Sequence, residues 1–275
     1  MTETVSVIKV SDLHINSTVA LSLPVLNLDD GGTYHSSRSQ RALWESWLDF
    51  WEQAGKLPGR RMGVFNGDLG ELDTKRRSNQ LITANKAVIL RHVTEVIEPA
   101  LDVLDIAVFI RGTQAHVGKG AWLEEAIAND TTITLKQGNT ASWYQFRGET
   151  AGVRQDIAHH ASMSGIPWQE KQAANKLAAL TLWYYLIEMR AAQPHIVSRS
   201  HNHRWSDSGN NYADIMAFCL PCWSLITEFG HRTGRENSTP QIGGTWEICQ
   251  DGKYQWDKRI YQPRQEARRL WALKI

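Results

Sequence analysis

Cysteine is scarce in this chain of 275 residues, no long apolar run occurs, and neither sign of charge is in excess. Three cysteines, an odd number, do not suit the disulfide framework of a small secreted protein and favour a reducing, cytoplasmic location. Apolar runs such as Ile106–Ile110 are as long as a strand, whereas a membrane helix needs about 18 residues. Residues 1–4 are polar and acidic, which predicts that no secretory signal peptide is present.

The formal net charge is +1, so the field of the whole molecule attracts neither nucleic acid nor a membrane surface. No internal repeat, low-complexity tract or linker is visible. Hydrophobic residues make up 42% of the chain and charged residues 21%, which suits one packed globular domain over residues 1–275. Tryptophan is unusually abundant, with 12 residues, and predicts aromatic packing in the core or on a binding face.

Short apolar strands alternate with long helical patterns, which indicates an α/β fold. The segment at 15–37, between the first expected strand and the first expected helix, has the length of a binding loop or a lid. Tryptophans in 39–53 recur at helical spacing, so they are expected in the core. Helices are expected at 39–53, 79–96, 122–129 and 168–192, the second ending or kinking near Pro99. Strands are expected at 5–10, 62–65, 106–110, 132–135, 142–146, 153–158 and 196–197, and within 212–220, 245–249 and 254–261.

Residues that can bind metal follow five of these strands, and six of the ten histidines lie there. In α/β folds the carboxyl ends of the strands are where ligands bind, so these residues are expected to converge. They are Asp12 and His14 after 5–10, Gly67 and Asp68 after 62–65, Gly112 to His116 after 106–110, His159 and His160 after 153–158, and His201 and His203 after 196–197.

The spacing of these residues indicates a site for two metal ions. Asp-x-His and His-x-His each place two ligands on one short extended segment, where both can reach one ion. Mixed sets of histidine, aspartate and amide suit manganese, iron or zinc. Asp68 follows a glycine and can bridge two cations with its two oxygens. Two ions about 3.5–4 Å apart clamp a phosphoryl group for in-line displacement.

The order Asp12-x-His14, Gly67-Asp68, Gly112…His116, His159-His160 and His201-x-His203 resembles that of the calcineurin-like metallophosphoesterase superfamily. That superfamily carries the motifs DxH, GDxxD/E, GNHD/E, a lone histidine after a strand, and GHxH. The resemblance runs over residues 5–205 and leaves 206–275 as C-terminal strands and a basic tail. It implies a four-layer α/β/β/α fold, in which helices flank a sandwich of two mixed sheets.

The resemblance also implies the roles of individual residues. Two divalent metal ions are expected, manganese first, with iron, zinc, nickel and magnesium as the alternatives. Glu71 stands at the second acidic position of the GDxxD/E motif and is expected to orient a ligand. The implied ligands are Asp12, His14, Asp68 and His203 for the first ion, with Asp68 bridging to a second ion held by His159 and His201.

The third motif departs from the family pattern. It reads Gly112-Thr113-Gln114-Ala115-His116, so the metal-binding asparagine is missing and the histidine is displaced by two residues. Gln114 can supply an amide oxygen in place of asparagine. His116 is then the catalytic residue that gives a proton to the leaving oxygen, or it is itself a metal ligand.

The activity implied is hydrolysis of a phosphate ester by a hydroxide held on the metals. The compact spacing, the altered third motif and the long segment at 15–37 resemble the small phosphoesterases of phage and prophage genomes. This favours a phosphodiesterase or nuclease acting on DNA, RNA or nucleotides, with Arg111 and His160 as substrate-binding candidates. The alternatives are a phosphomonoesterase and a binding protein that kept the fold and lost activity.

The basic, aromatic stretch from Lys253 onward either contacts nucleic acid or is simply solvated. The sequence does not reveal the oligomeric state.

Overall fold

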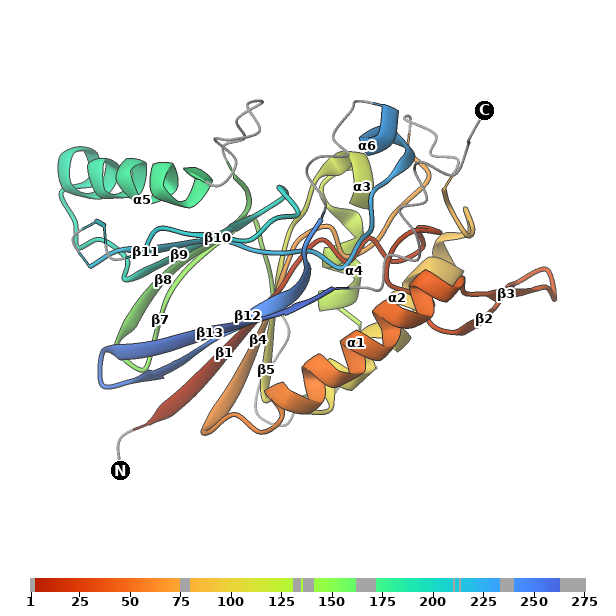
Figure 1. Ribbon diagram of the computed structural model, residues 1–275, viewed down its shortest axis with the longest axis horizontal. Helices are drawn as coiled ribbons and strands as arrows, with labels where there is room; N and C mark the ends of the chain where they lie inside the picture. Colours follow the sequence, from red (N-terminus) through yellow and green to blue (C-terminus); the bar gives the residue numbers. More distant parts are fainter. Residues whose placement is uncertain are drawn as a thin grey trace, which may run out of the picture.

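Two β-sheets packed face to face form the centre of the protein (Figure 1). The computed structural model describes residues 3–74, 80–130, 135, 141–161, 172–209, 211–212, 214–232 and 240–262. Helices α1 and α2 lie on the outer side of one sheet, and α5 lies on the outer side of the other (Figure 1). The predicted four-layer α/β/β/α sandwich is therefore confirmed.

The first sheet has six strands in the order β13-β12-β1-β4-β5-β6. Its parallel half ends at one edge, because β1, β4, β5 and β6 all run in the same direction. An antiparallel hairpin of β12 and β13 pairs with β1 on the other side. The bounds are Thr4–Val10 for β1, Arg60–Asn66 for β4, Ile106–Ile110 for β5, Ala141–Trp143 for β6, Ile242–Gln250 for β12 and Lys253–Tyr261 for β13.

The second sheet has five strands in the order β10-β11-β9-β8-β7, and β8, β9 and β11 are parallel. Residues 142–146, expected as one strand, divide at Tyr144 between β6 of the first sheet and β7 of the second. The expected strand was therefore wrong as one unit, because the chain crosses between sheets there. The bounds are Gln145–Thr150 for β7, Val153–His160 for β8, Ile196–Ser200 for β9, Ser206–Asp207 for β10 and Met216–Cys219 for β11.

Alternation along the strands divides the core. In β1, Ile8 and Val10 face the helices, whereas Val5 and Val7 face the second sheet. Helix α1 (Arg38–Ala54) starts with a capping box at Ser37 and buries an aromatic stripe against the first sheet. Its tryptophans pack in the core as predicted: the rings of Trp47 and Trp51 are buried, and Trp47 meets Trp223 edge-on at 4.8 Å.

The other helices refine the sequence prediction. Helix α2 (Lys86–Leu101) begins later than expected, because the side chain of Asn85 caps the backbone N–H groups of Ala87 and Val88. Pro99 lies inside this helix rather than at its end. None of the described residues forms a helix long and apolar enough to cross a membrane. The remaining bounds are Gln114–Val117 for α3, Trp122–Ala128 for α4, Ala173–Trp183 for α5, Tyr184–Met189 for the π-helical η2 and Glu228–Arg232 for α6.

The remaining expectations concern the segment at 15–37 and regions that lie partly outside the described residues. The segment at 15–37 is not structureless, since β2 (Val25–Asn27) and β3 (Thr33–His35) form a hairpin within it. Residues 132–134 of the strand expected at 132–135 and the first residues of the helix expected at 168–192 lie outside the described residues. The same holds for 263–275, which carries much of the basic tail.

Candidate metal centre

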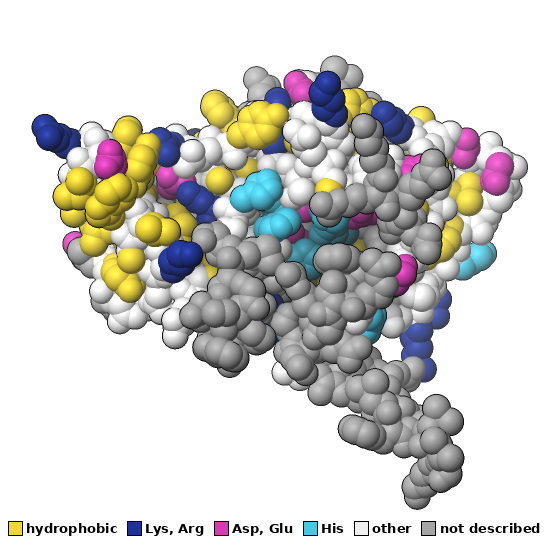
Figure 2. All heavy atoms as spheres, turned by 90° about the horizontal axis from the view of Figure 1, so that it is seen from above, with side chains coloured by type: hydrophobic (Ala, Val, Ile, Leu, Met, Phe, Trp, Pro, Cys, Tyr) yellow, Lys and Arg dark blue, Asp and Glu magenta, His cyan; other side chains and the backbone are white. Residues whose placement is uncertain are grey.

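The loops that follow β1, β4, β5 and β9 meet the end of β8 at one edge of the sandwich. His159 and His160, expected to follow a strand at 153–158, are the last two residues of β8, because this strand runs two residues further than predicted. Backbone hydrogen bonds continue beyond the paired strands, from Asp12 N to the Gly67 oxygen and from His14 N to the Asp68 oxygen, both 3.0 Å long. These bonds hold the first two motifs side by side. Figure 2 shows histidine side chains gathered near the middle of this face.

Five of the predicted ligand residues have left-handed backbone conformations. The φ angles of these residues lie between 46° and 71°, although none of them is glycine. Such conformations cost about 1–3 kcal/mol each and cluster at functional sites, where the surrounding structure enforces them. The five residues are Asp12, His14, Asp68, His201 and His203.

Two glycines let the loops approach each other. A Cβ atom on Gly67 would lie 2.4 Å from Nδ1 of His159. A Cβ atom on Gly112 would lie 2.2 Å from Oδ1 of Asp68. Any other residue at either position would displace a predicted ligand, so the glycines of the second and third motifs serve close packing.

Asp12, His14 and His203 form the first ligand group, with one ligand atom of each within 4.8 Å of the others. Asp12 is fully buried, and its Oδ1 has no hydrogen-bond partner. Nε2 atoms of His203, His159 and His14 lie around that oxygen at 3.3, 3.8 and 3.9 Å. A buried carboxylate oxygen without a donor is costly, and imidazole nitrogens bind divalent metals. These residues therefore fit a divalent cation.

The second ligand group contains Asp12, Asp68, His159 and His201. Nδ1 of His159 donates to the Asn66 carbonyl at 2.7 Å, which leaves Nε2 of the same ring facing Asp68 Oδ2 at 3.1 Å. Burial alone would lower the pKa of His159, but the carboxylates of Asp68 and Asp12 raise it to about 9. The pair of carboxylates thus attracts positive charge, as a metal site must.

Asp12 is common to both groups, whereas Asp68 belongs to the second group alone. Burial would raise the pKa of the Asp68 carboxyl, but His159 holds it well below its usual range. The bridging role expected of Asp68 stays a prediction.

Glu71 joins two histidines at the edge of the first group. Its carboxylate accepts from Nδ1 of His14 at 3.0 Å and from Nδ1 of His116 at 2.8 Å. Burial would raise the pKa of Glu71, but hydrogen bonds from the two histidines lower it to about 2. This geometry is the one that an orienting role requires. The same contacts make His14, Glu71 and His116 a third potential ligand group, so both roles considered for His116 remain predictions.

Thr113, rather than Gln114, faces the second group. Its hydroxyl lies 3.3 Å from His201 Nδ1 and 3.4 Å from His160 Nε2, and its backbone N–H donates to Asp68. Gln114 is exposed at the start of α3, and its ligand role stays a prediction. Thr113 follows Gly112 directly, where the family motif has asparagine. That position was the signal by which sequence reasoning could have found it.

We expect Thr113 to set the affinity of the second ligand group for manganese. Thr113→Val removes an oxygen and should weaken binding there by about tenfold, whereas Thr113→Asn supplies an amide and should tighten it. Titration calorimetry with Mn²⁺ checks both shifts, and Gln114→Ala is the matched control, expected to be neutral. A loss of affinity in Gln114→Ala with none in Thr113→Val would reverse the assignment.

The two substrate-binding candidates differ in position. His160 is exposed beside the second group, with its ring centroid 5.2 Å from that of His201. Arg111 precedes Gly112, and its guanidinium contacts Ser142, Glu125 and the ring of Tyr144. Neither role is tested by these contacts.

Glu124 is a buried carboxyl that sequence reasoning missed. It lies on α4 and accepts a hydrogen bond from the backbone N–H of Leu69, next to Asp68. Burial raises its pKa to about 8, so it is largely uncharged at neutral pH. In the sequence, Glu124 is only one acidic residue of a helical pattern. Its contact with Leu69 depends on how α4 packs, so the sequence could not predict it.

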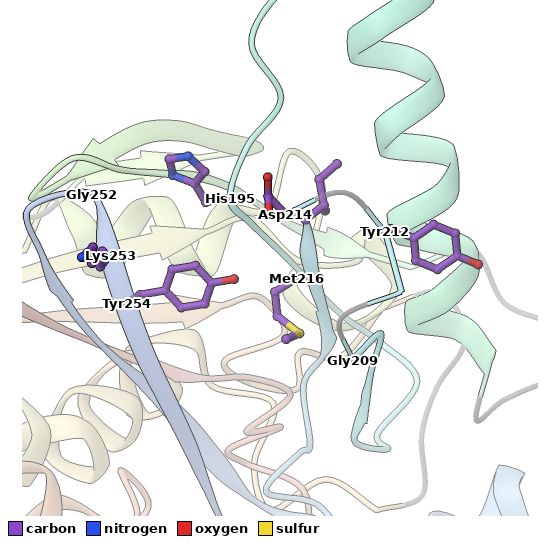
Figure 3. Close-up of a pocket in the computed structure, with 9 residues that line it drawn as sticks. His195, Gly209, Tyr212, Asp214, Met216, Gly252, Lys253 and Tyr254 are labelled. Atoms are coloured by element: carbon purple, nitrogen blue, oxygen red, sulfur yellow. The ribbon is translucent and has the colours of Figure 1, made fainter.

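A separate cavity of about 550 Å³ opens at the other end of the second sheet, where His195 precedes β9 and Met216 begins β11. Figure 3 shows these two residues with Tyr254 of the β12–β13 hairpin around it. Among the described residues, the groups of histidine and acidic side chains that could hold an ion all lie at the opposite edge.

No family model matches the chain, and no curated protein matches its sequence. Similar solved structures include an archaeal phosphodiesterase at 10% identity and a TM-score of 0.45, covering 93% of this chain and 99% of that chain. They also include zinc-bound Vps29 from Entamoeba histolytica, at 9% identity and a TM-score of 0.38, covering 94% and 99%. A third is the phosphoesterase YfcE from E. coli, at 14% identity and a TM-score of 0.38, covering 88% and 90%.

These likenesses are too distant to carry an argument about function. The four layers and the convergence of the motifs at one sheet edge agree with what the resemblance to calcineurin-like metallophosphoesterases implies. No observation tests the phage-type subtype, which stays a prediction.

Proposed function

We propose that this protein is a dinuclear metal-dependent phosphoesterase that hydrolyses phosphodiesters of nucleic acids or nucleotides. One observation carries the proposal: two adjacent ligand groups share the buried Asp12, whose free carboxylate oxygen faces three imidazole nitrogens. Two such groups side by side suit the pair of divalent ions, manganese first, that phosphoryl transfer uses.

Divalent ions bound here would neutralise phosphoryl oxygens and lower the pKa of a bound water. The chain's own residues would do the rest. Glu71 accepts the hydrogen bond from Nδ1 of His116, so Nε2 of that ring is the atom that can give a proton to a leaving oxygen. His160 stands exposed at the rim, where an imidazole can donate to a substrate oxygen.

Preference for nucleic acid or nucleotides is supported by the surface beside the site. Tyr144 is 62% exposed, and the guanidinium of Arg111 lies 4.8 Å from its ring centroid. Arg111 is adjacent in sequence to Gly112, which packs against Asp68. An aromatic ring and a cation beside a phosphoryl site suit a base and a backbone phosphate.

The first test compares Mn²⁺-dependent hydrolysis of bis(p-nitrophenyl) phosphate with that of p-nitrophenyl phosphate. Faster cleavage of the diester supports the proposal, and cleavage of the monoester alone would make the protein a phosphatase. Metal binding without turnover of either ester would favour a binding protein on the same fold. Cleavage of an oligonucleotide with a steep salt dependence would then separate a nuclease from a hydrolase of small diesters.

Glu71→Gln should lower diester turnover by about 10–100-fold while leaving the fold intact. Glutamine keeps the shape but loses the charge that holds two Nδ1–H groups, so His14 and His116 lose their orientation. Steady-state kinetics with a titration of Mn²⁺ measures the change. Glu45→Gln, an exposed carboxyl on α1, is the control; an unchanged Glu71→Gln would contradict the orienting role.

A further inference from the structure

A small cavity on the outer face of the second sheet carries more positive than negative charge. Its volume is about 180 Å³, and it lies between β7, β8, β9 and the junction of α5 with η2. The charged residues that line it are two arginines and one aspartate: Arg147, Arg199 and Asp156. We call it the two-arginine cavity. Figure 2 shows cationic side chains between the histidines of the metal centre and the end of the molecule where Figure 1 places α5.

The carboxylate of Asp156 holds both guanidinium groups in place. Its Oδ1 accepts from Arg199 at 2.8 Å, and its Oδ2 accepts from Nε of Arg147 at 3.2 Å. Gln145 and Tyr185 donate to the same carboxylate at 2.9 and 3.1 Å. Burial would raise the pKa of Asp156, but Arg199 holds it below its usual value, so the carboxylate stays charged. Because one carboxylate faces two guanidinium groups, one positive charge in the cavity is not balanced.

Arg147 has donors left for a ligand. A guanidinium offers five N–H groups, and the contacts of Arg147 with Asp156 and Tyr184 engage only some of them. The side chain of Arg147 is 43% exposed, so a ligand can reach it from solvent. A guanidinium held in this way matches the oxygens of a phosphate. Pockets for whole small molecules usually exceed about 300 Å³, so this smaller cavity fits a phosphate group alone.

The two-arginine cavity lies on strands that lead to the metal centre. Arg199 precedes the ligand His201 by two residues, and Asp156 precedes the ligand His159 by three. At a rise of about 3.3 Å per residue, the cavity is roughly 7–10 Å from the second ligand group. A phosphate bound in the cavity would therefore belong to a different nucleotide from the ester at the metals.

Exposed tyrosines accompany the cations near the cavity and near the metal centre. Cζ of Arg147 lies 5.9 Å from the ring centroid of Tyr184. Cζ of Arg111 lies 4.8 Å from that of Tyr144, and the next residue, Gln145, lines the cavity. Tyr184 is 37% exposed and Tyr144 is 62% exposed. Cations beside exposed rings suit a single strand, whose unpaired bases are free to stack.

We propose that the two-arginine cavity binds a second phosphate of a single-stranded nucleic acid whose scissile ester lies at the metals. This inference rests on the proposed function and adds that the substrate is an oligonucleotide rather than a single nucleotide. Arg147 binds the phosphate, Asp156 positions Arg147, and Tyr184 stacks with a base. An acidic peptide is a poorer ligand, because its carboxylates would leave both exposed rings without a stacking partner.

Fluorescence anisotropy with labelled single strands of about eight nucleotides, in EDTA, tests the cavity without any need for turnover. Arg147→Met should weaken binding by about tenfold and lower the slope of log Kd against log salt by about 0.7, the value for one lost phosphate contact. Asp156 keeps its bond from Arg199, so the fold should persist. Arg147→Lys should restore the slope, since it restores the charge. Arg91→Met, an arginine on α2 that is 48% exposed, is the matched control and should be neutral.

Kinetics distinguish this inference from the function on which it rests. The ratio of kcat/KM for the oligonucleotide to that for bis(p-nitrophenyl) phosphate should fall about tenfold in Arg147→Met and stay constant in Arg91→Met. Equal effects of the two variants on binding, duplex DNA bound as tightly as the single strand, or polyglutamate competing as well as the oligonucleotide would each overturn the inference. Binding that depends on Arg147 without turnover of any diester would support the cavity and contradict the proposed function.

Discussion

Asp68→Asn should lower the turnover of bis(p-nitrophenyl) phosphate by at least about 10³-fold, which corresponds to roughly 4 kcal/mol in the barrier. Asp68 is buried, its Oδ2 lies 3.1 Å from His159 Nε2, and its Oδ1 accepts from Thr113 N–H. Asparagine keeps the size of the side chain but removes the charge that a pair of cations needs. The loss should therefore appear in metal content as well as in rate.

The measurement is kcat together with metal content by mass spectrometry, on protein dialysed against Mn²⁺. Asp105→Asn is the matched control: Asp105 is also buried, but it accepts from the backbone N–H of Arg61 at the far end of the first sheet. Activity of Asp68→Asn within tenfold of the original would contradict the role given to this carboxylate. Equal loss in Asp105→Asn would point to damage to the fold.

Much of this site could be predicted because its residues stand close in sequence to the ends of strands. Apolar runs of strand length predicted β1, β4, β5, β8 and β9, and parallel strands end at the same edge. Residues at or just after the ends of those strands therefore had to meet. Asp12 and His203 are 191 residues apart in sequence, yet each follows the end of its own parallel strand closely enough for their side chains to lie 3.3 Å apart.

What escaped prediction depends on packing rather than pattern. Thr113 faces His201 because the chain turns into α3 one residue later, which sends Gln114 to the surface. Tyr144 interrupts a continuous strand pattern because the two halves pair with different sheets. Neither event changes the apolar periodicity, so neither is visible in the sequence.

The sequence also did not predict the environment of Lys9. It lies in a strand that reads as apolar, and it is fully buried between the sheets. Its Nζ donates to Glu247, Gln155 and Ser198 at 2.8–2.9 Å. These partners lie on β12, β8 and β9, so a single ammonium group ties the two sheets together.

Lys9→Met should destabilise the protein by about 3–5 kcal/mol, because it leaves Glu247 buried without its counter-charge. Urea unfolding measures the loss. Lys56→Met, an exposed lysine paired with Glu52, is the control and should cost at most about 0.5 kcal/mol. A Lys9→Met cost as small as that of the control would mean that Glu247 finds another partner.

The double variant Lys9→Met/Glu247→Leu should be more stable than Lys9→Met alone, since apolar replacements can offset a lost buried pair.

The pH dependence of the stability of Lys9→Met is an independent test of the buried pair. Burial raises the pKa of Glu247 although the Lys9 ammonium opposes that rise, so removing the ammonium leaves the effect of burial unopposed. In Lys9→Met, stability should therefore be highest at low pH and fall as pH rises from the ordinary pKa of glutamate through the raised one. A Lys9→Met deficit that stays constant across that range would show that the carboxylate is solvated, and that the damage comes from lost packing instead.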